Sequence, residues 1–372
     1  MKAVVTGADG FLGWHLRALL STLPGWDVVG VGRSRWSPGD LTRAVTGADV
    51  VFHLAGINRA TEYDVEHGNV ALAEQLTDAL TEALTGRSVP VVVFAGSTQA
   101  DLDVPYGRGK RVAGEHLAQW AVSAGGAAAD VRLPGLFGEH GRPAYNSFVA
   151  TFADQVARGQ TPQVTGDRDV PLLHVHAAAR VLVQVAQARY SGVVEVGAEP
   201  VRISEVARLL QEYHATYSPH GDIPALHTPL EVALFNTYRA ALWAHRPVIA
   251  LTPRSDQRGT LVESVRVHGG PGQSFVSSTH PGYVRGEHFH FRKIERFQVI
   301  QGRGRIRLRK LFDPISAVQT YDVSGESPCA IDMPTLWTHS IENIGDGDLT
   351  TLFWTNELFD PDDPDTHPHP VH

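Results

Sequence analysis

Along the first 130 residues, short apolar runs typical of strands alternate with segments whose apolar residues have helical spacing. Residues 2–6 form a short apolar run typical of a buried strand, whereas residues 13–23 carry leucines at helical spacing. Further strands are expected at 26–31, 49–54 and 89–94, and a further helix at 69–84. Strands that alternate with helices predict an α/β fold with a parallel, doubly wound sheet.

Helical spacing continues beyond this region, and then the pattern changes. Helices are expected at about 108–124, 146–158, 175–188 and 204–217. After Arg246 the chain consists of short β-type runs with glycine turns, the clearest at 261–267, 295–300, 304–311 and 350–354. This pattern predicts a small antiparallel barrel, so we expect an N-terminal domain at 1–246 and an all-β domain at 247–372. The last segment, 359–372, is expected to be an irregular tail.

Composition and charge narrow the class of protein. A length of 372 residues agrees with two hydrophobic cores, because single domains rarely reach this size. The formal net charge of -8 argues against nucleic acid or an anionic membrane as the main partner. The single cysteine, Cys329, cannot form an intrachain disulfide, which fits a reducing compartment. The sequence contains neither an apolar run of about 18 residues nor a signal peptide, so we expect a cytoplasmic protein.

A glycine-rich segment joins the first predicted strand to the first predicted helix. Gly7, Gly10 and Gly13 are three residues apart, and Phe11 and Leu12 lie between the last two. Glycine lets the backbone turn tightly and approach a pyrophosphate at a helix N-terminus. In this position the pattern predicts a dinucleotide site, with a purely structural turn as the alternative.

The end of the second predicted strand distinguishes the two nicotinamide cofactors. Enzymes that use NAD place Asp or Glu there to bind the ribose 2′-hydroxyl group. This chain has Arg33, which would pair with a 2′-phosphate and favours NADPH; an exposed arginine without a ligand is the alternative. Other residues expected to line the cofactor are Asp40 and Leu41 beside the adenine, and Leu54, Ala55 and Gly56 after the third strand.

Tyr106 and Lys110 form the candidate catalytic pair of this domain. Their spacing places both side chains on one face of a helix, one turn apart. A lysine ammonium near the phenol would lower the tyrosine pKa and make Tyr106 a proton donor to a ketone during hydride transfer. Ser97 or Thr98, at the end of the preceding strand, would hydrogen-bond the same ketone oxygen.

These features resemble the extended short-chain dehydrogenase/reductase family, which mostly acts on nucleotide sugars. One position departs from the family pattern: Gly109 stands where a serine usually precedes the lysine. The resemblance implies a Rossmann fold for the N-terminal domain.

The second half contains a candidate metal site. His288 and His290 are two residues apart, so both point to the same side of a strand, and Glu295 and His339 follow at a distance. Three imidazoles and a carboxylate inside a barrel can bind a divalent metal and leave positions open for substrate. The residue types alone do not select the metal, and zinc is the ion we expect.

This spacing resembles the two motifs of the cupin family, which implies a jelly-roll barrel. Leu336 replaces the usual glycine of the second motif. Histidines packed in a metal-free barrel are the alternative, because sugar epimerases without metal share this fold. His367, His369 and His372 lie in the Pro-rich tail and are expected to be solvated rather than metal-bound.

Over nearly the whole chain the sequence resembles the CapF-type bifunctional enzymes of capsule and O-antigen biosynthesis. The match is carried by RLPGLFG at 132–138, RPAYNS at 142–147, SDQRG at 255–259, THPG at 279–282, RG at 285–286 and NELFDP at 356–361. The resemblance implies a UDP-linked 2-acetamido-2,6-dideoxy-4-ketohexose as substrate, on the route to UDP-N-acetyl-L-fucosamine. The cupin domain would epimerise C3, and the reductase would then reduce the C4 ketone with NADPH. A homodimer is also implied.

Five residues are candidate substrate contacts. They are Arg132, Arg142, Asn146, His280 and Arg285. Arginine binds phosphate in a bidentate manner, although these residues could equally be ordinary surface groups. A neutral histidine is the natural base for removing the C3 proton, and His280 or an unligated histidine of the pocket could serve. His280 also stands where lysine is expected in this family.

Three rival functions remain open from the sequence. The first is a reductase/epimerase that acts on a different nucleotide ketosugar in secondary metabolism. The second is a non-catalytic sensor of NADPH and sugar, although Tyr106 and Lys110 are both intact. The third is a barrel that serves only to dimerise the chain, which leaves the histidine cluster unexplained.

Overall fold

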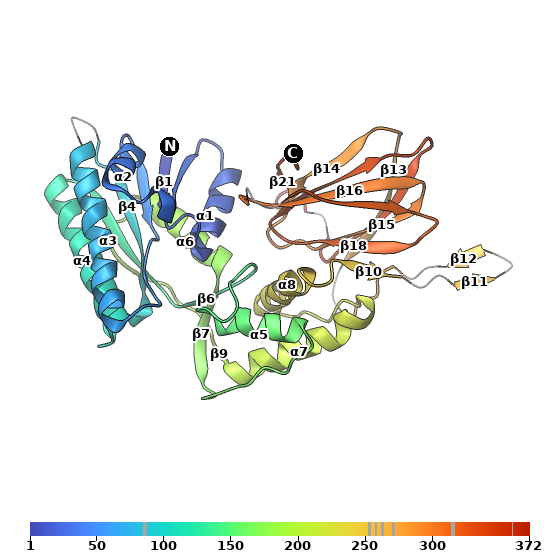
Figure 1. Ribbon diagram of the computed structural model, residues 1–372, viewed down its shortest axis with the longest axis horizontal. Helices are drawn as coiled ribbons and strands as arrows, with labels where there is room; N and C mark the ends of the chain where they lie inside the picture. Colours follow the sequence, from blue (N-terminus) through green and yellow to red (C-terminus); the bar gives the residue numbers. More distant parts are fainter. Residues whose placement is uncertain are drawn as a thin grey trace. The chain divides into compact units, whose positions relative to one another are not determined.

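The computed structural model describes residues 1–84, 88–251, 254–256, 259–261, 264–269, 272–313, 317–358 and 360–372. The chain divides into two compact units (Figure 1). The first unit comprises Met1–Phe137, Ala144–Ser147 and Asp169–Arg202, and the second comprises Gly138–Pro143, Phe148–Arg168 and Ile203–His372. Among the described residues, no helix has both the length and the apolar character needed to cross a membrane.

A six-stranded parallel sheet forms the centre of the first unit. Its order is β2–β1–β3–β4–β5–β8, built from β1 (Lys2–Thr6), β2 (Asp27–Val31), β3 (Val50–His53), β4 (Val91–Ser97), β5 (Ala127–Leu133) and β8 (Gly192–Glu195). Strands β1, β3 and β4 are buried almost throughout, as expected for a sheet covered on both faces. The predicted doubly wound α/β fold is therefore confirmed.

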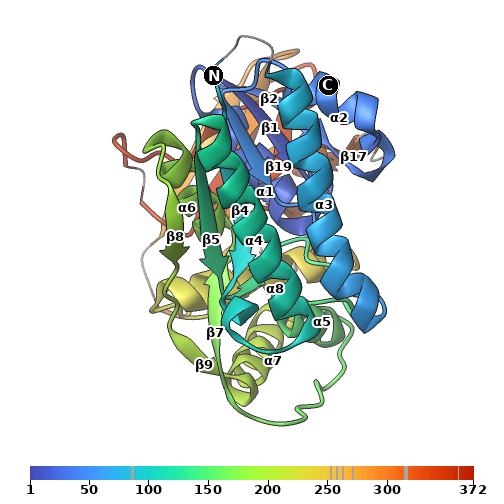
Figure 2. The same cartoon turned by 90° about the vertical axis from the view of Figure 1, so that its left-hand side faces the viewer.

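Helices cover both faces of this sheet (Figure 2). On one face lie α2 (Pro38–Val45), α3 (Glu62–Ala83) and α4 (Pro105–Ala124), and on the other lie α1 (Phe11–Thr22) and α6 (Val175–Gln187). Leu76, Leu117 and Phe94 belong to the buried core beneath the first group. Two 3₁₀ turns, η1 (Arg33–Arg35) and η2 (Thr98–Asp101), follow β2 and β4, and a small sheet combines β6 (Gly135–Phe137), β7 (Asp169–His174) and β9 (Pro200–Arg202).

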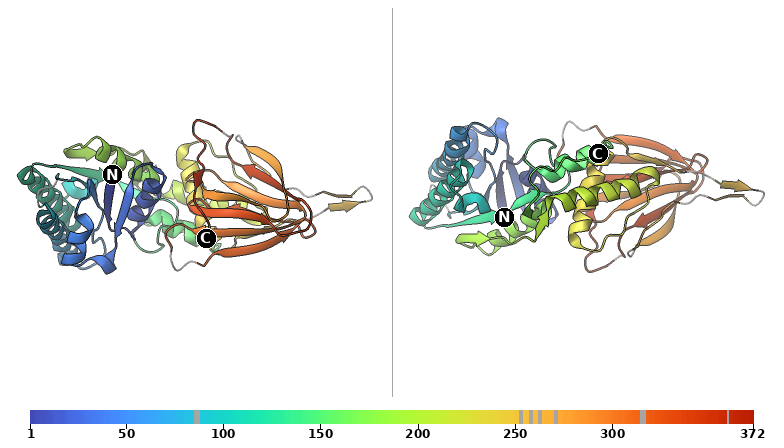
Figure 3. Two further views of the ribbon diagram at one scale, coloured as in Figure 1. Left: turned by 90° about the horizontal axis from the view of Figure 1, so that it is seen from above. Right: turned by 90° about the horizontal axis from the view of Figure 1, so that it is seen from below.

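The second unit is built on two five-stranded sheets (Figure 3). One sheet contains β10 (Val248–Ala250), β18 (Cys329–Met333), β15 (Glu295–Gln301), β20 (Leu349–Thr355) and β13 (Gln273–Thr279), in this order. The other contains β17 (Gln319–Ser324), β16 (Arg303–Lys310), β19 (Trp337–Asn343), β14 (Val284–Phe289) and β21 (His367–Pro368). Both sheets contribute to one buried core, with Phe297 and Phe353 from the first and Leu308 and Ile341 from the second. Two antiparallel sheets with a shared core confirm the predicted all-β, cupin-like barrel.

A short hairpin also belongs to the second unit. It pairs β11 (Arg254–Asp256) with β12 (Gly259–Leu261). The strand predicted at 261–267 and the SDQRG and NELFDP segments fall partly on residues 257–258, 262–263 and 359, which lie outside the described residues.

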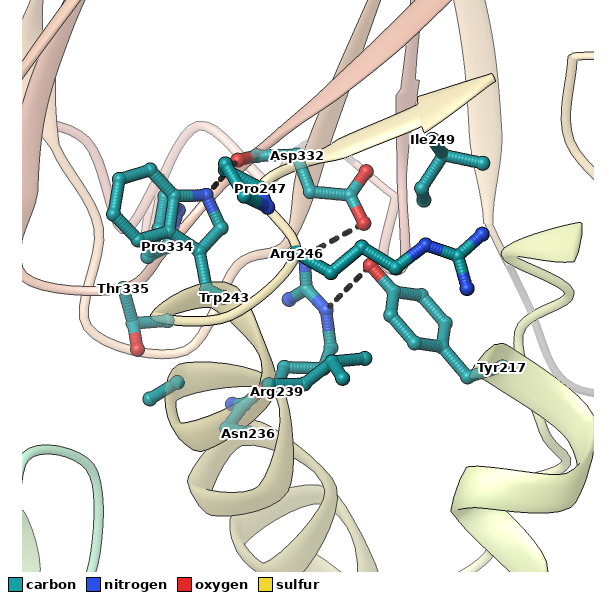
Figure 4. A pocket seen from close by; sticks show the side chains of 12 residues that line it. Tyr217, Asn236, Arg239, Trp243, Arg246, Pro247, Ile249, Asp332, Pro334 and Thr335 are labelled. Atoms are coloured by element: carbon teal, nitrogen blue, oxygen red, sulfur yellow. Dashed lines mark hydrogen bonds and ion pairs between the residues drawn. The ribbon is translucent and has the colours of Figure 1, made fainter. Parts of the chain in front are cut away.

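Three helices also belong to the second unit: α5 (Phe148–Ala157), α7 (Ile203–His220) and α8 (Pro229–Trp243). The compact units therefore divide the chain differently from the expected ranges 1–246 and 247–372. Ionic and aromatic contacts explain why α8 packs with the barrel. Arg239 of α8 lies 3.3 Å from the Asp332 carboxylate of β18 (Figure 4). Arg296 of β15 donates to the same carboxylate at 2.7 and 3.1 Å. Trp243 packs on Trp337, with ring centroids 4.4 Å apart.

The C-terminal segment is not the solvated, irregular tail that the sequence suggested. His367–Pro368 form β21, which pairs with β14, and the Val371 side chain is fully buried. The Val371 amide donates to Glu287 Oε2 at 2.8 Å. The His367 ring is half-buried against Phe289, at a centroid distance of 5.4 Å, because its strand joins the barrel edge. His372 is exposed, as expected.

Gly109 should be required for the packing of α4 against α3. A Cβ at position 109 would lie 2.6 Å from the Glu66 carbonyl oxygen, and a backbone group cannot move aside cheaply. We expect Gly109→Ala to lower the free energy of unfolding by about 1–3 kcal/mol, the usual cost of overpacking. The matched control is Gly39→Ala in α2, where a Cβ has open space, so its effect should be neutral or stabilising. Chemical denaturation measures both; equal effects would contradict the packing argument.

Candidate functional site

The glycine segment forms a tight loop between β1 and α1. Gly7 has a φ of 65°, and a Cβ there would lie 2.7 Å from the Ala55 amide nitrogen. A Cβ at Gly13 would lie 2.2 Å from the Gly7 carbonyl oxygen. Gly10 caps α1 without a side chain, which leaves room beside the first helical residues, Phe11 and Leu12. The loop therefore has the form that a pyrophosphate requires.

Arg33 is exposed in η1 directly after β2, where a ribose-binding residue is expected. Asp40 and Leu41 lie in α2 and have roles within that helix. Leu41 is a core residue, 1% exposed. Asp40 accepts a hydrogen bond from Ser37 and forms an ion pair with Arg43. Contact of Asp40 and Leu41 with adenine remains a prediction.

Leu54, Ala55 and Gly56 follow β3 next to the glycine loop. The Leu54 and Ala55 amides donate to Thr6 Oγ1 at 3.2 and 3.3 Å. The same hydroxyl lies 2.9 Å from His53 Nδ1. Burial, with a smaller contribution from Lys110, lowers the pKa of His53 to about 3, so its ring is neutral. These contacts fix the segment that was predicted to border the cofactor, which begins with His53, and the sequence alone gave no reason to expect Thr6 there.

Tyr106, Lys110 and Ser97 come together at the start of α4. Tyr106 is the second residue of this helix, and Ser97 ends β4 and hydrogen-bonds the phenol. Lys110, one turn further on, is 4% exposed, and its Nζ lies 4.4 Å from the centroid of the Phe94 ring. Burial lowers the pKa of Lys110 to about 8, although the Asp130 carboxylate opposes this shift. Ser97 and the half-buried Tyr106 thus form a hydrogen-bonded pair, and the buried Lys110 lies one turn further along the same helix.

The expected fall of the Tyr106 pKa below its ordinary value is not found. Burial raises the pKa of Tyr106 above its ordinary value of 10, and the hydrogen bond with Ser97 offsets only part of the rise. The phenol therefore holds its proton at neutral pH, as a proton donor must. The choice between Ser97 and Thr98 is also clearer, because Ser97 is buried against Tyr106 and Thr98 is exposed.

The three proposed contacts of the nucleotide sugar differ in their surroundings. Arg132 is bound to carboxylates: Asp101, Asp130 at 3.3 Å and Glu195 at 3.6 Å. These three anions leave Arg132 little charge to offer a phosphate. Arg142 and Asn146 are exposed, in the segment between β6 and α5.

The four predicted metal ligands converge inside the barrel. Their ligand atoms all lie within 4.8 Å of one another, with His288 on β14, Glu295 on β15, His339 on β19 and His290 just after β14. The Nε2 atoms of His290 and His339 are each 3.2 Å from Glu295 Oε2, and that of His288 is 3.8 Å away. Burial would raise the pKa of Glu295, but hydrogen bonds from the three imidazoles hold it well below its ordinary value.

The outer contacts of this cluster orient two imidazoles. His290 Nδ1 is hydrogen-bonded to the Asp365 carbonyl oxygen, and His339 Nδ1 lies 3.3 Å from the Trp337 carbonyl oxygen. If Nδ1 donates its proton to the carbonyl, Nε2 of each ring can serve as the ligand atom for a cation. In addition, Nε2 of His288 and of His290 is buried without a well-formed hydrogen bond. Three imidazoles and one carboxylate suit a divalent cation.

A cavity of about 210 Å³ opens beside this cluster. Its lining residues are Gln273, Phe275, His288, Lys293, Glu295, Thr355 and Thr366. The side chain of Lys293 is 5% exposed, and its Nζ donates to the Pro364 carbonyl oxygen at 2.6 Å. Sequence reasoning missed Lys293, although its place between the ligands His290 and Glu295 was a usable signal.

Leu336 occupies the position that usually holds glycine in the second cupin motif. Its φ is 63°, a conformation that non-glycine residues rarely adopt. The side chain is 2% exposed, and the amide donates to the His290 carbonyl oxygen at 2.9 Å. Burial and this hydrogen bond explain how leucine is tolerated there.

His280 and Arg285 lie at the other end of the barrel from the cluster. In the sheet register Glu295 and Gln273 both pair with Thr355, whereas Thr279 pairs with Leu349. His280 follows Thr279, so it lies about 20 Å along β13 from the level of Glu295. It is 75% exposed and hydrogen-bonded to Asp348, and Arg285 donates to Thr279. The structure does not bring either residue to the cluster.

Two family models match the chain, one for each half. The NAD dependent epimerase/dehydratase family matches residues 3–197, and the polysaccharide biosynthesis C-terminal domain matches residues 254–367. A UDP-2-acetamido-2,6-beta-L-arabino-hexul-4-ose reductase from Pseudomonas aeruginosa is 34% identical over 99% of this chain and 98% of its own length.

Solved structures agree with these matches. A crystal structure of the capsular polysaccharide assembling protein CapF from Staphylococcus aureus is 32% identical over all of both chains, with a TM-score of 0.63. A structure of CapF with the inhibitor 3-isopropenyl-tropolone is 29% identical over all of both chains, with a TM-score of 0.58. The chain therefore belongs to the NAD dependent epimerase/dehydratase family and, over its whole length, to the CapF-type proteins within it.

Proposed function

We propose that this protein is a bifunctional, NADPH-dependent nucleotide-sugar enzyme. The barrel epimerises C3 of a UDP-linked 2-acetamido-2,6-dideoxy-4-ketohexose, and the Rossmann domain reduces the C4 ketone, on the route to UDP-N-acetyl-L-fucosamine. The observation that supports the proposal is the hydrogen-bonded pair of Ser97 and Tyr106 with the buried Lys110 one turn away, in a domain with an intact glycine loop. The Pseudomonas aeruginosa relative, a reductase of a UDP-linked hexul-4-ose, supports the same substrate class.

In the reduction, each residue of the buried group has a distinct role. NADPH, when bound, supplies the hydride that adds to C4. Tyr106 donates its phenolic proton to O4, and Ser97 hydrogen-bonds the same oxygen, so the ketone becomes a hydroxyl group. Lys110 stabilises the phenolate that remains until a proton returns from solvent.

In the epimerisation, the proton on C3 is acidic because the neighbouring C4 is a ketone, but the enolate needs stabilising. His288, His290, Glu295 and His339 would hold a divalent metal such as zinc, whose Lewis acidity would favour the enolate. The Lys293 ammonium beside the cavity adds positive charge. The tropolone inhibitor of CapF offers adjacent oxygens that chelate metals, which supports a metal site of this kind.

We further propose that residues 1–246 form the reductase domain and residues 247–372 the cupin domain. The enzyme would be a homodimer in the cytoplasm. Arg132, Arg142 and Asn146 remain proposed contacts of the nucleotide sugar.

Tyr106→Phe should lower kcat for ketone reduction by about 10²–10⁴-fold, because it removes the proton donor and leaves the fold intact. NADPH affinity, measured by fluorescence titration, should change little. The control is Tyr63→Phe, an exposed tyrosine on α3. Ser97→Ala should also slow the reaction, whereas Thr98→Ala should not. Full reduction by the Tyr106→Phe variant would instead favour a non-catalytic role for this residue.

Arg33→Ala should weaken the binding of NADPH but not of NADH, since it removes a charge-assisted contact with the 2′-phosphate. We expect the KM for NADPH to rise about 10–100-fold and the KM for NADH to change little. Arg189→Ala, at an exposed arginine after α6, is the matched control. Equal effects on both cofactors would refute the assignment.

Deuterium exchange at C3, followed by NMR in D₂O with full-length protein and no NADPH, tests the barrel chemistry. Metal removal by a chelator or His339→Ala should abolish exchange and bound metal, because each disrupts the ligand set. His280→Ala should keep both, because His280 lies at the far end of the barrel. Exchange that survives chelation would refute the metal, and exchange lost only in His280→Ala would restore His280 as the base.

A further inference from the structure

The turn that joins His290 to Glu295 is held by hydrogen bonds from the C-terminal part of the chain. The amides of Phe291, Arg292 and Lys293 donate to the Asp365 carboxylate at 3.0, 2.8 and 2.8 Å. The next amide, of Ile294, donates to Asn356 Oδ1 at 2.8 Å. Every amide between the two ligands is therefore held by a residue more than 60 positions away in the sequence.

Asp365 also contacts a ligand directly. Its carbonyl oxygen accepts the hydrogen bond from His290 Nδ1, while its carboxylate holds the turn. The residue is 3% exposed, so water does not compete for these bonds. One residue thus fixes both the orientation of the His290 ring and the path of the chain from His290 to Glu295.

The segment around Asp365, residues 360–372, is itself bound to the barrel; we call it the C-terminal arm. Lys293 Nζ donates to Pro364 O and Thr366 Oγ1 at 2.6 and 3.2 Å. Beyond it, β21 pairs with β14 and Val371 is buried. Asp365 is therefore held from both sides, which a positioning role requires.

We propose that Asp365 is a positioning residue for the metal ligands of the barrel, acting through the His290 ring and the 291–294 turn. The inference rests on the proposed metal site and adds a residue to it. Hydrogen-bond partners outside the ligand set commonly change metal affinity by about 10–100-fold. In Asp365→Asn the amide NH₂ group faces amide donors, so at least one of the three bonds is lost.

Zinc affinity of the full-length protein, measured by competition with a chromophoric chelator, tests the proposal. Asp365→Asn should bind zinc about 10–100-fold more weakly than wild type, and the exposed control Asp362→Asn should match wild type. Ketone reduction supplied with epimerised substrate should be unchanged in both variants. ¹⁵N spectra of metal-free protein should show shifted amide signals for residues 291–293 in Asp365→Asn but not in Asp362→Asn.

Asn356→Ala is the second variant, in case Asp365→Asn does not fold. It removes only the Ile294 bond, so zinc binding should weaken several-fold. Wild-type affinity in a folded Asp365→Asn, or in Asn356→Ala if that is the variant available, would overturn the positioning role and leave the metal site intact. Wild-type protein that binds no zinc would overturn both proposals together.

Discussion

Glu295 is a buried carboxylate whose oxygen lies within 3.8 Å of three imidazole nitrogens, and the barrel depends on keeping these groups together. Burying a carboxylate is costly unless it is hydrogen-bonded or paired with a cation. Burial lowers the pKa of His339 to about 4, against the opposing effect of Glu295, so this ring is neutral near pH 7. His339 therefore adds no positive charge to offset the Glu295 carboxylate.

The reductase half also contains ionisable side chains that are removed from solvent. Lys110 is buried and Tyr106 is half-buried, and loss of solvent disfavours the charged form of each, which is why the lysine pKa falls and the tyrosine pKa rises. A nicotinamide cofactor and a ketosugar would change this environment. The protein part alone already provides a protonated phenol beside a serine hydroxyl.

Much of the fold could be predicted because it depends on local patterns. The parallel sheet, the glycine loop and the Tyr106–Lys110 spacing all follow from short-range periodicity. The sequence did not predict helix α8, because its apolar residues are spread around the helix instead of lying on one face. Thr228 and Glu231 at its start were a usable signal, since the Thr228 hydroxyl accepts from the Glu231 amide as an N-cap does. Strand β21 has only two residues, too few to show a period.

The ligand set could be predicted, but its surroundings could not. His288 and His290 are linked by strand periodicity, whereas the contact of His290 with Asp365 joins residues 75 positions apart. The placement of His280 was equally invisible, because only the register of β13 against β20 reveals which end of the barrel it occupies. Only the structure likewise identifies Lys293 as a residue that lines the cavity.

The carboxylate of Asp332 has a consequence for protein engineering. Arg239 of α8 and Arg296 of β15 both bind this carboxylate. In a chimaera that joins this barrel to another reductase at residue 246, α8 would come from the other protein and Arg239 would be replaced. A foreign helix without an equivalent of Arg239 would remove one of the two cations that hold this buried carboxylate. Recombination between relatives should therefore keep α8 together with the barrel.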